Sequence, residues 1–566
     1  MSQFKEYKNL NLIDVAENVA EFWKQNKTFN KSVEIREGQP EFVFYEGPPS
    51  ANGMPGIHHV MARALKDIFC RYQTQNGKQV FRKAGWDTHG LPVELGVEKE
   101  LGITKEDIGT KISIEDYNKA CREAVMRYTD VWNNLTEKIG YWVDLDDPYI
   151  TYKSKYMETV WWLLKQLYDK GLLYKGYTIQ PYSPKAGTGL SSHEVNQPGA
   201  YRDVSDTTVV AQFKTLPETL PSFLQGFGDV HFLAWTTTPW TLPSNTALTV
   251  GPKIDYVLVK TFNQYTFESV NVVLAKALVG KQFAKKYSEG TEEDFANYTS
   301  ESKIIPYQIL AEFKGADLVG IKYEQLLDYA KPYQNPENAF RVISGNFVTT
   351  EDGTGIVHTA PTFGADDAKV AKEATPEVPP MLVLDKNGNP VPLVDLQGRF
   401  LSQVSDEIYG FANEYVKGEY LSEEEKNTEF NIQKEKLKSI ISDLKTYLSV
   451  DERIALKLRK ENKAFKVEKY VHSYPHSWRT DEPLLYYPLD SWFVKMTAVK
   501  DRLVDLNKEI NWKPEATGTG RFGKWLENAN DWNLSRSRYW GIPIPIWSSE
   551  EGDERICIDS IATLKN

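Results

Sequence analysis

The sequence predicts an α/β protein in which a parallel sheet with crossing helices is interrupted by an inserted β-rich domain. Within residues 42–69 a strand-like run, a Gly/Pro loop and a helical pattern follow one another, which is the opening unit of a parallel sheet. Between about 200 and 400, short β-rich runs alternate with Gly, Pro and Asn turns. After about residue 470 the aromatic α/β character returns, so we expect the β-rich part to be an insertion.

The N-terminal segment predicts the first helix, strand and second helix in order. Residues 10–26 place their apolar side chains on one face at helical spacing. The run 42–45 is typical of a buried strand, and it stops at Gly47-Pro48-Pro49. We expect the second helix to turn its apolar face toward a core; that face consists of Val60, Met61, Ala64, Leu65, Ile68 and Phe69.

Later segments follow the same alternation of patterns. Residues 115–170 are again helical and rich in Trp and Tyr. Residues 421–465 are dense in charge and carry a sparse apolar stripe, which favours a solvated linker hairpin over a packed element; the stripe consists of Leu437, Ile440, Ile441, Leu444 and Leu448.

Composition narrows the class of protein. The chain has 566 residues, which exceeds what one core supports, and 41% hydrophobic with 26% charged residues is ordinary for a globular protein. A net charge of -11 argues against a wholly electrostatic nucleic-acid binder, although local basic patches can still hold an RNA. We find no membrane-length apolar run and no signal peptide at the start. The few Cys form no C-x-x-C pair, so we expect a cytoplasmic protein in a reducing compartment.

The first chemical motif lies in the loop of residues 45–59. Small residues such as Gly53 and Gly56 let a ligand approach the backbone, and Asn52 adds a polar group. His58 and His59 stand where a helix begins, and a helix N-terminus attracts phosphate. Taken alone, a Gly/Pro-rich loop with His is more often only a loop.

The second chemical motif is divided between two distant segments. Thr236, Thr237 and Thr238 stand between Trp235 and Pro239, and three adjacent hydroxyl side chains cannot all face one core. Residues 353–361 bring His358, and Asp366 and Asp367 follow. Singly, a Thr run is usually a β-edge and an Asp pair a solvated turn.

Together with two further blocks, these motifs resemble the class I aminoacyl-tRNA synthetases. Residues 45–59 are similar to the nucleotide motif of that family, and residues 85–94 to its second block. Residues 520–541 are similar to the isoleucine branch rather than to its valine or leucine relatives. The resemblance implies a class I Rossmann-type catalytic domain interrupted by a β-rich editing domain. The implied domains are 1–195 (N-terminal helix and first catalytic half), 196–415 (editing), 416–468 (helical connection) and 469–566 (second catalytic half, before the lysine-rich nucleotide loop).

The resemblance also implies roles for single residues of the activation site. Gly56, His58 and His59 would act in catalysis and, with Asn52 and Gly53, bind ATP. Asp87 would pair with the α-ammonium group of isoleucine, and Pro48, Trp492 and Trp532 would enclose its side chain, because an aliphatic ligand is held by an apolar wall. Asn528 would contact the carboxylate. Core packing of the Trp residues is the alternative interpretation.

An editing site is implied by the second motif. In the family the Thr-rich strand holds the 3′ end of the charged tRNA, so Thr236, Thr237 and Thr238 would do so here. Asp367 would anchor the ammonium group of the wrong amino acid, and His358 would belong to the same site. One methylene contributes too little binding energy to reject valine in a single step, so a second, size-selective site is needed.

The implied reaction joins isoleucine to ATP as isoleucyl-adenylate and then transfers it to the isoleucine tRNA, with hydrolysis of valyl-tRNA as proofreading. ATP would enter as a substrate with Mg²⁺, and the protein would be a monomer without a membrane partner. We expect no structural zinc, because Pro475-His476 is followed by Ser477 and Thr480 where many relatives have paired Cys.

Two departures from the family pattern leave alternatives open. The family tetrad His-x-Gly-His is Gly56-Ile57-His58-His59 here, with its first and third positions exchanged. The lysine-rich second nucleotide motif is not found within the 566 residues, which predicts that the chain is a fragment. The alternatives are a valine-specific synthetase and a non-catalytic amino-acid- or RNA-binding remnant.

Overall fold

A computed structural model describes residues 9–549 and 554–566. The chain divides into two compact units. Unit 1 consists of Met1–Tyr174 and Phe493–Asn566, and unit 2 consists of Lys175–Trp492. The predicted α/β class with an inserted β-rich part is confirmed, because unit 2 stands between the two segments of unit 1. The finer boundaries at 195, 415 and 468 stay a prediction.

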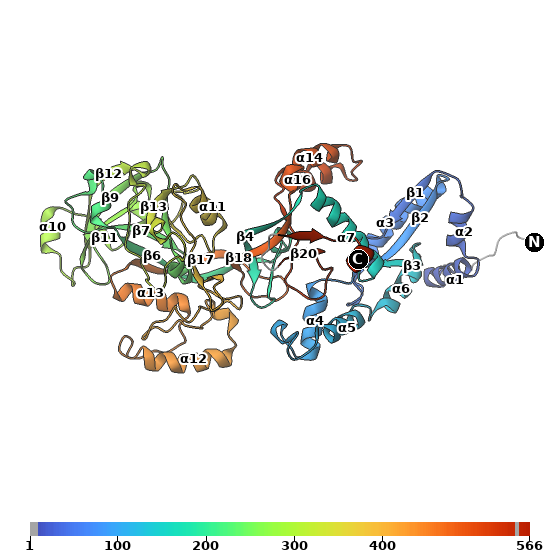
Figure 1. The fold of residues 1–566 in the computed structure, drawn as a ribbon, viewed down its shortest axis with the longest axis horizontal. Coiled ribbons are helices and arrows are strands. Elements are labelled where there is room, and N and C mark those ends of the chain that lie inside the picture. The colour runs from blue at the N-terminus through green and yellow to red at the C-terminus, as the bar shows by residue number, and fades with distance from the viewer. Residues whose placement is uncertain (1–8, 550–553) are drawn as a thin grey trace, which may run out of the picture. The chain divides into compact units, whose positions relative to one another are not determined.

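Unit 1 is built on a three-stranded parallel sheet of order β1-β2-β3 (Figure 1). Its strands are β1 (Glu41–Tyr45), β2 (Gln79–Trp86) and β3 (Asp144–Ile150), with Phe42 opposite Val80 in the register. Helix α3 (Ile57–Gln75) connects β1 to β2. The predicted sequence of strand, Gly/Pro loop and helix is therefore confirmed, and the loop lies at the carboxyl end of β1.

The predicted burial of the apolar face of α3 is wrong. Helix α1 (Leu12–Gln25) lies within the predicted helical range, has Asn11 as its N-cap and buries no side chain. In α3, Ile68 is 62% exposed and Phe69 55%. The face of α3 that is buried carries Arg63, Cys70 and Thr74 instead, and the described part of the chain places no second layer over the apolar face. Periodicity predicted the helices correctly but not which face is covered.

Further helices and short strands complete unit 1. The first segment also contains α2 (Thr28–Glu34), α4 (Leu91–Leu101), α5 (Ile114–Val125), α6 (Thr129–Lys138) and α7 (Ser154–Asp169). The second segment contains α14 (Lys500–Lys508), α15 (Glu515–Thr519), α16 (Arg521–Glu527), β19 (Trp532–Asn533), β20 (Ile546–Ser548), β21 (Arg555–Cys557) and α17 (Ile561–Lys565).

Unit 2 is dominated by a ten-stranded sheet. Its main order is β11-β12-β9-β10-β7-β14-β8-β13, and β6 pairs with both β7 and β17. These strands are β6 (Tyr201–Lys214), β7 (Val230–Thr236), β8 (Ala247–Val250), β9 (Asp255–Phe262), β10 (Ser269–Ala275), β11 (Tyr287–Glu289), β12 (Ile305–Lys314), β13 (Arg341–Ser344), β14 (Ile356–Thr359) and β17 (Ala464–Pro475).

The remaining elements of unit 2 are not strands of this sheet. β18 (Leu485–Val494) and β4 (Leu173–Ser183) contain the points where the chain passes between the units. The others are β5 (Thr188–Gly189), α8 (Ser192–Val195), α9 (Val279–Gln282), α10 (Glu292–Asn297), α11 (Ala365–Glu373), β15 (Leu382–Leu384), β16 (Pro390–Pro392), α12 (Glu423–Lys436) and α13 (Val450–Lys460).

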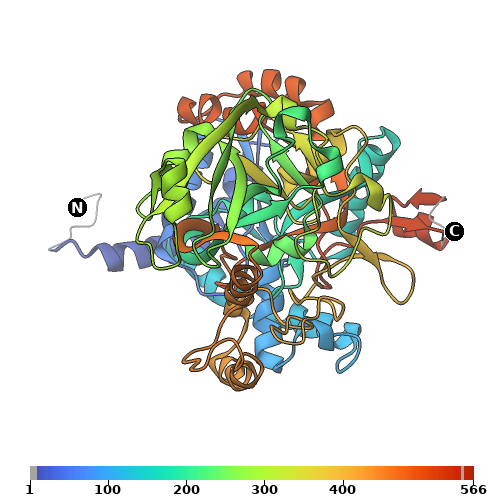
Figure 2. The same cartoon turned by 90° about the vertical axis from the view of Figure 1, so that its left-hand side faces the viewer.

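The expected solvated hairpin over residues 421–465 is wrong for its second half. Helix α13 lies between the sheet and α12 in both views (Figures 1 and 2). Its side chains Ile454 and Leu458 belong to the main hydrophobic core of unit 2. Its charged residues Asp451 and Arg453 are buried as well, because each has a partner of opposite charge. Charge density predicts solvation only when the charges are unpaired.

Candidate functional site

In unit 1, hydrogen bonds from three different segments hold the loop between β1 and α3. The N–H of Asp87, directly after β2, donates to Pro49 O at 3.0 Å. The indole N–H of Trp132 donates to Gly53 O at 2.9 Å, and the N–H of Tyr128 donates to Ala51 O at 3.1 Å. Because neighbouring parallel strands end at one edge of the sheet, the loop and the second block meet there, where α/β proteins commonly bind ligands.

The exchanged tetrad forms the N-terminus of α3. Gly56 N donates to His59 Nδ1 at 2.9 Å, and the His59 ring packs against Trp132 with centroids 4.7 Å apart. Burial and the neighbouring His58 and Arg63 lower the pKa of His59, so its ring stays neutral and accepts this bond. His58 is exposed, with its ring 3.8 Å from that of His59.

The exchange of Gly56 and His58 is spatially compensated. A Cβ added at Gly56 would lie 2.8 Å from Cε1 of His58, closer than side chains pack. The His58 imidazole therefore occupies the space that a side chain at position 56 would take. One imidazole therefore remains at the N-terminus of α3, although residue 58 carries it rather than residue 56.

Asp87 provides the carboxylate at the same edge. Its side chain is exposed to solvent, but partial desolvation by the surrounding protein raises its pKa above the usual range for Asp. Burial lowers the pKa of the adjacent His89 to about 4, and its ring lies edge-to-face with Trp540 at 5.3 Å. Desolvation therefore favours the neutral form of both side chains, and at neutral pH the His89 imidazole is uncharged.

Of the other predicted isoleucine-binding residues, Pro48 belongs to the loop at this edge, whereas no contact that the structure shows brings Asn528 or Trp532 to it. Trp532 lies in β19 and is 58% exposed. Asn528 is the C-cap of α16, and its side chain donates back to Lys524 O at 2.8 Å. No hydrogen bond, ion pair or ring contact within residues 9–549 and 554–566 joins either of them to Asp87. Trp492 is the last residue of unit 2.

Sequence reasoning missed Glu94 of α4, which organises the second block. Its buried carboxylate accepts the N–H groups of Tyr539 at 3.1 Å and Trp540 at 3.0 Å and the Nε–H of Arg538 at 2.9 Å. Trp540 in turn donates its indole N–H to Thr88 O. Glu94 and its partners lie inside the two blocks of residues 85–94 and 520–541. A pairing across more than 400 residues, however, leaves no local signal in the sequence.

In unit 2, the Thr-rich segment and the His358 strand are neighbours. Thr236 is the last residue of β7, and Trp235 pairs with Val357 of β14. Thr236 Oγ1 accepts the N–H of Thr238 at 3.1 Å, and a 3₁₀ turn, η4 (Pro239–Ser244), follows directly. Thr237 lies half-buried between them. The sheet order therefore unites segments that are about 120 residues apart.

Hydrogen bonds fix the tautomer of His358. The amide Nδ2 of Asn245 donates to Ala247 O and to His358 Nδ1, both at 2.8 Å, so Nδ1 is an acceptor. The proton then resides on Nε2, which donates to Thr241 Oγ1 at 3.0 Å, and Thr241 donates to Thr238 O at 2.8 Å. Burial lowers the pKa of His358 to about 3. His358 therefore positions the loop and has no free nitrogen to act as a base.

Asp367 lies in the first turn of α11 and is half-buried. Its Oδ2 accepts the N–H of Ala360 at 2.8 Å. Burial raises its pKa to about 6, with a smaller contribution from Asp366, so it is mostly ionised at neutral pH. The ring of Trp240 packs edge-to-face on Phe363 at 5.0 Å and so connects the Thr-rich loop with the segment before Asp367.

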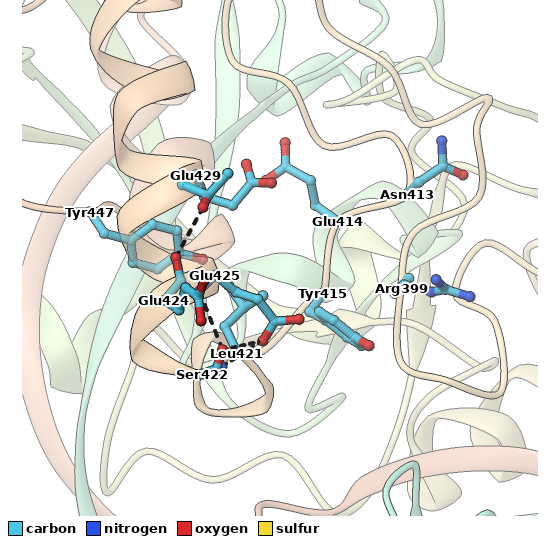
Figure 3. A pocket seen from close by; sticks show the side chains of 11 residues that line it. Arg399, Asn413, Glu414, Tyr415, Leu421, Ser422, Glu424, Glu425, Glu429 and Tyr447 are labelled. Atoms are coloured by element: carbon cyan, nitrogen blue, oxygen red, sulfur yellow. Dashed lines mark hydrogen bonds between the residues drawn. The ribbon is translucent and has the colours of Figure 1, made fainter. Parts of the chain in front are cut away.

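A separate pocket of about 660 Å³ in unit 2 contains none of the predicted site residues (Figure 3). Its acidic side chains serve the structure: Glu425 accepts from the N-cap residue Ser422, and Glu414 pairs with Arg453. An acidic hollow of this kind repels the phosphates of RNA. We therefore assign it no role in the predicted chemistry.

In the part of the chain that the structure describes, we find neither a metal-binding group of side chains nor a helix that could span a membrane. Within the described residues no group of three or more His, Cys, Asp or Glu is arranged to hold a metal ion. Ser477, at the position expected to lack a zinc ligand, accepts the N–H groups of Arg479 and Thr480 in a local turn. Cys70, Cys121 and Cys557 are buried free thiols. Among the residues whose positions are described, no helix combines the length and apolar character needed to cross a bilayer.

Comparison with known proteins gives matches along nearly the whole chain. A family model described as tRNA synthetases class I (I, L, M and V) matches residues 18–566. The chain is similar to an isoleucine–tRNA ligase of Cytophaga hutchinsonii, with 62% identity over 99% of this chain and 48% of that protein. It is also similar to that of Bacteroides fragilis (59% identity; 100% and 48%) and of Porphyromonas gingivalis (56%; 100% and 48%). The chain spans about half the length of the curated relatives it matches.

Proposed function

The chain belongs to the tRNA synthetases of class I (I, L, M and V) and has their mixed α/β fold with several sheets, and from this premise we propose that it comes from an isoleucine–tRNA ligase. The proposed reaction forms isoleucyl-adenylate from isoleucine and ATP in unit 1 and transfers the isoleucine to its tRNA. The relatives named isoleucine–tRNA ligase, at 56–62% identity, support this substrate over valine.

The observation that carries the activation proposal is the meeting of the tetrad loop and the Asp87 block at one sheet edge, through Asp87 N and Pro49 O. The first turn of α3 and the imidazoles of His58 and His59 would receive the phosphates, because preorganised donors stabilise developing negative charge. The Asp87 carboxyl group would hold the ammonium group of isoleucine. Magnesium would arrive with ATP as part of the substrate. Pro48 belongs to the loop, whereas the roles of Trp492, Asn528 and Trp532 are carried by the resemblance alone.

The test is amino-acid-dependent exchange of pyrophosphate into ATP by the full-length protein that contains this chain. We expect isoleucine to drive exchange far better than valine. A preference for valine would support the valine-specific alternative, and no exchange with any amino acid would support the non-catalytic remnant. We also expect the 566-residue chain alone to exchange poorly, because a cationic loop that neutralises the triphosphate is not among its motifs.

We further propose that unit 2 hydrolyses valyl-tRNA. The convergence of the Thr236–Thr238 loop, the neutral His358 and the ionised Asp367 supports this role. Asp367 would hold the ammonium group of valine, and the Thr hydroxyls would hold the 3′ end of the tRNA. Because both nitrogens of His358 are occupied, the reaction would depend on a positioned water rather than on this imidazole as a base.

The hydrolytic proposal is tested with preformed valyl-tRNA and isoleucyl-tRNA. The full-length protein should cleave the valyl ester much faster than the isoleucyl ester. Equal rates for the two esters would contradict a size-selective site, and no cleavage of either would contradict the hydrolytic role itself.

A further inference from the structure

Two buried charged side chains, Lys417 and Asp451, form a cluster with the partly buried Asp206 that is connected to the Thr-rich loop of unit 2. Lys417 Nζ lies 3.3 Å from Asp206 Oδ2 and 3.8 Å from Asp451 Oδ2. Lys417 is only 3% exposed and Asp451 6%. The ammonium group also lies 4.6 Å from the ring centroid of Tyr474. Burying such charges is costly, so the cluster persists only because its partners compensate one another.

Asp451 uses its two oxygens for different purposes. While Oδ2 faces Lys417, Oδ1 accepts the backbone N–H of Trp240 at 2.7 Å. A hydrogen bond to a carboxylate is short and strong compared with one between neutral groups. Asp451 stands in the first turn of α13, whose N-cap Ser449 accepts from Glu452 N, so the carboxylate is carried by a firmly capped helix start.

Trp240 joins the two halves of the proposed hydrolytic site. It directly follows Thr236–Pro239 in the chain, so its main chain sets the end of the Thr-rich loop. Its ring contacts Phe363, which stands four residues before Asp367. A shift of the Trp240 main chain would therefore change the distance between the Thr hydroxyls and the Asp367 carboxylate.

We propose that Asp451 is a positioning residue for the hydrolytic site, which holds the Thr236–Thr238 loop in register with Asp367 through the Trp240 N–H, and that Lys417 orients this carboxylate. The proposal rests on the proposed hydrolysis of valyl-tRNA. Asp451 touches neither the substrate nor the water. Burial raises the pKa of Asp451 to about 7, and the Lys417 ammonium group opposes this rise.

A residue with a purely structural role would change the unfolding temperature when it is substituted but would not change hydrolysis. A second ion pair that involves α13 offers a matched control for such a role. Asp406 forms a similar half-buried pair with Lys457 of α13 at 2.9 Å and accepts the N–H of Tyr409 at 2.9 Å, but it has no contact with the Thr-rich loop in the described residues. Asp406→Asn should lower the unfolding temperature without changing hydrolysis. In Asp451→Asn the side chain keeps its shape and one oxygen that can accept the Trp240 N–H. The amide N–H₂ group, which is a donor, then faces the ammonium group of Lys417.

The experiment measures kcat and KM for valyl-tRNA hydrolysis, and isoleucine-dependent pyrophosphate exchange, in the full-length protein. Asp451→Asn should lower the kcat of hydrolysis roughly tenfold to hundredfold, with KM and exchange little changed, because sub-ångström misplacement acts on the reacting geometry. Adding Lys417→Met to Asp451→Asn should restore most of the rate, because the amide can then present its oxygen to Trp240.

The outcomes separate this inference from the function on which it rests. If the wild-type protein does not hydrolyse valyl-tRNA, the proposed hydrolytic function fails and the inference falls with it. If the wild type is active and Asp451→Asn keeps the wild-type kcat, or if Asp406→Asn lowers kcat as much as Asp451→Asn does, the positioning role is overturned while the function stands. Should Asp451→Asn not fold, the double variant decides: a folded double variant with near wild-type kcat supports the inference, and one that is folded but more than tenfold slower overturns it.

Discussion

The two candidate sites differ in how completely their surroundings are assembled. The Thr-rich site of unit 2 is enclosed by a ten-stranded sheet, and His358 is 7% exposed with both ring nitrogens bonded. The tetrad of unit 1 stands on a three-stranded sheet, with His58 and Asp87 open to solvent. The difference suggests a division of work: a rigid, closed network suits size selection, whereas an open edge suits three substrates that must enter and leave.

The largest expected effect is at the ammonium anchor of the closed site. Asp367→Ala should either lower valyl-tRNA hydrolysis by roughly a hundredfold or more, or extend cleavage to isoleucyl-tRNA, because the anchor also sets the register of the substrate. The measurement is single-turnover deacylation of both esters. Asp366→Ala is the matched control, since its exposed neighbouring carboxylate lacks the bond to Ala360. Unchanged rates for both esters in Asp367→Ala would remove this residue from the site.

At the open site, the exchanged tetrad should tolerate a double change better than a single one. Gly56→His should lower isoleucine-dependent pyrophosphate exchange roughly tenfold or more, because the new side chain meets the His58 ring at 2.8 Å. Adding His58→Gly removes that obstacle and should recover most of the exchange rate. Equal activity of the single variant and the wild type would show that the two positions are not coupled.

The unfolding free energy of the chain should depend on pH through His358 of the closed site. The pKa of His358 is about 3 in the folded chain and 6.5 unperturbed, so its contribution to stability is fully present above pH 6.5 and is lost as the pH falls toward 3. At pH 5 the loss amounts to about 2 kcal/mol of unfolding free energy. Denaturant unfolding of the wild type and of His358→Gln at pH 7.5 and pH 5 measures it. A wild-type loss no greater than that of His358→Gln would contradict a buried neutral imidazole.

The smallest expected effect is at the open apolar face of unit 1. In the 566-residue chain, Ile68→Ala should change the unfolding free energy by less than about 0.5 kcal/mol, because Ile68 is 62% exposed. Leu248→Ala, in the fully buried β8, should cost about 2–5 kcal/mol. Urea unfolding followed by Trp fluorescence compares them. A cost for Ile68→Ala as large as that for Leu248→Ala would mean that the face is covered.

Local sequence patterns predicted most of what lies within one stretch of chain. The strand, Gly/Pro loop and helix of residues 42–69 were predicted because hydrophobic period and turn residues are local signals. The insertion was predicted because its short β-rich runs and turns differ from the aromatic α/β pattern of the segments on both sides. The position of His58 and His59 at a helix start followed from the same local reasoning, and the structure confirms it.

Long-range pairing accounts for what sequence reasoning could not reach. The hydrogen bond from the Trp240 N–H to Asp451 joins residues that are 211 positions apart in the sequence. The bond between Glu94 and Arg538 joins residues that are 444 positions apart. Helix α13 was predicted to be solvated because its charges are visible in the sequence while their partners are not. Conversely, the apolar face of α3 was predicted to be covered, because periodicity shows that a face is apolar but not what lies against it.

The division of activation and proofreading between the two units is tested most directly by AMP formation from ATP when the full-length protein is given valine with or without the isoleucine tRNA. If unit 1 activates and unit 2 hydrolyses, adding the tRNA should accelerate AMP formation with valine while no valyl-tRNA accumulates. If Asp367→Ala lowers hydrolysis, valyl-tRNA should accumulate in that variant instead. Accumulation of valyl-tRNA by the wild type, or AMP formation that the tRNA does not change, would contradict the division of activation and proofreading between the two units.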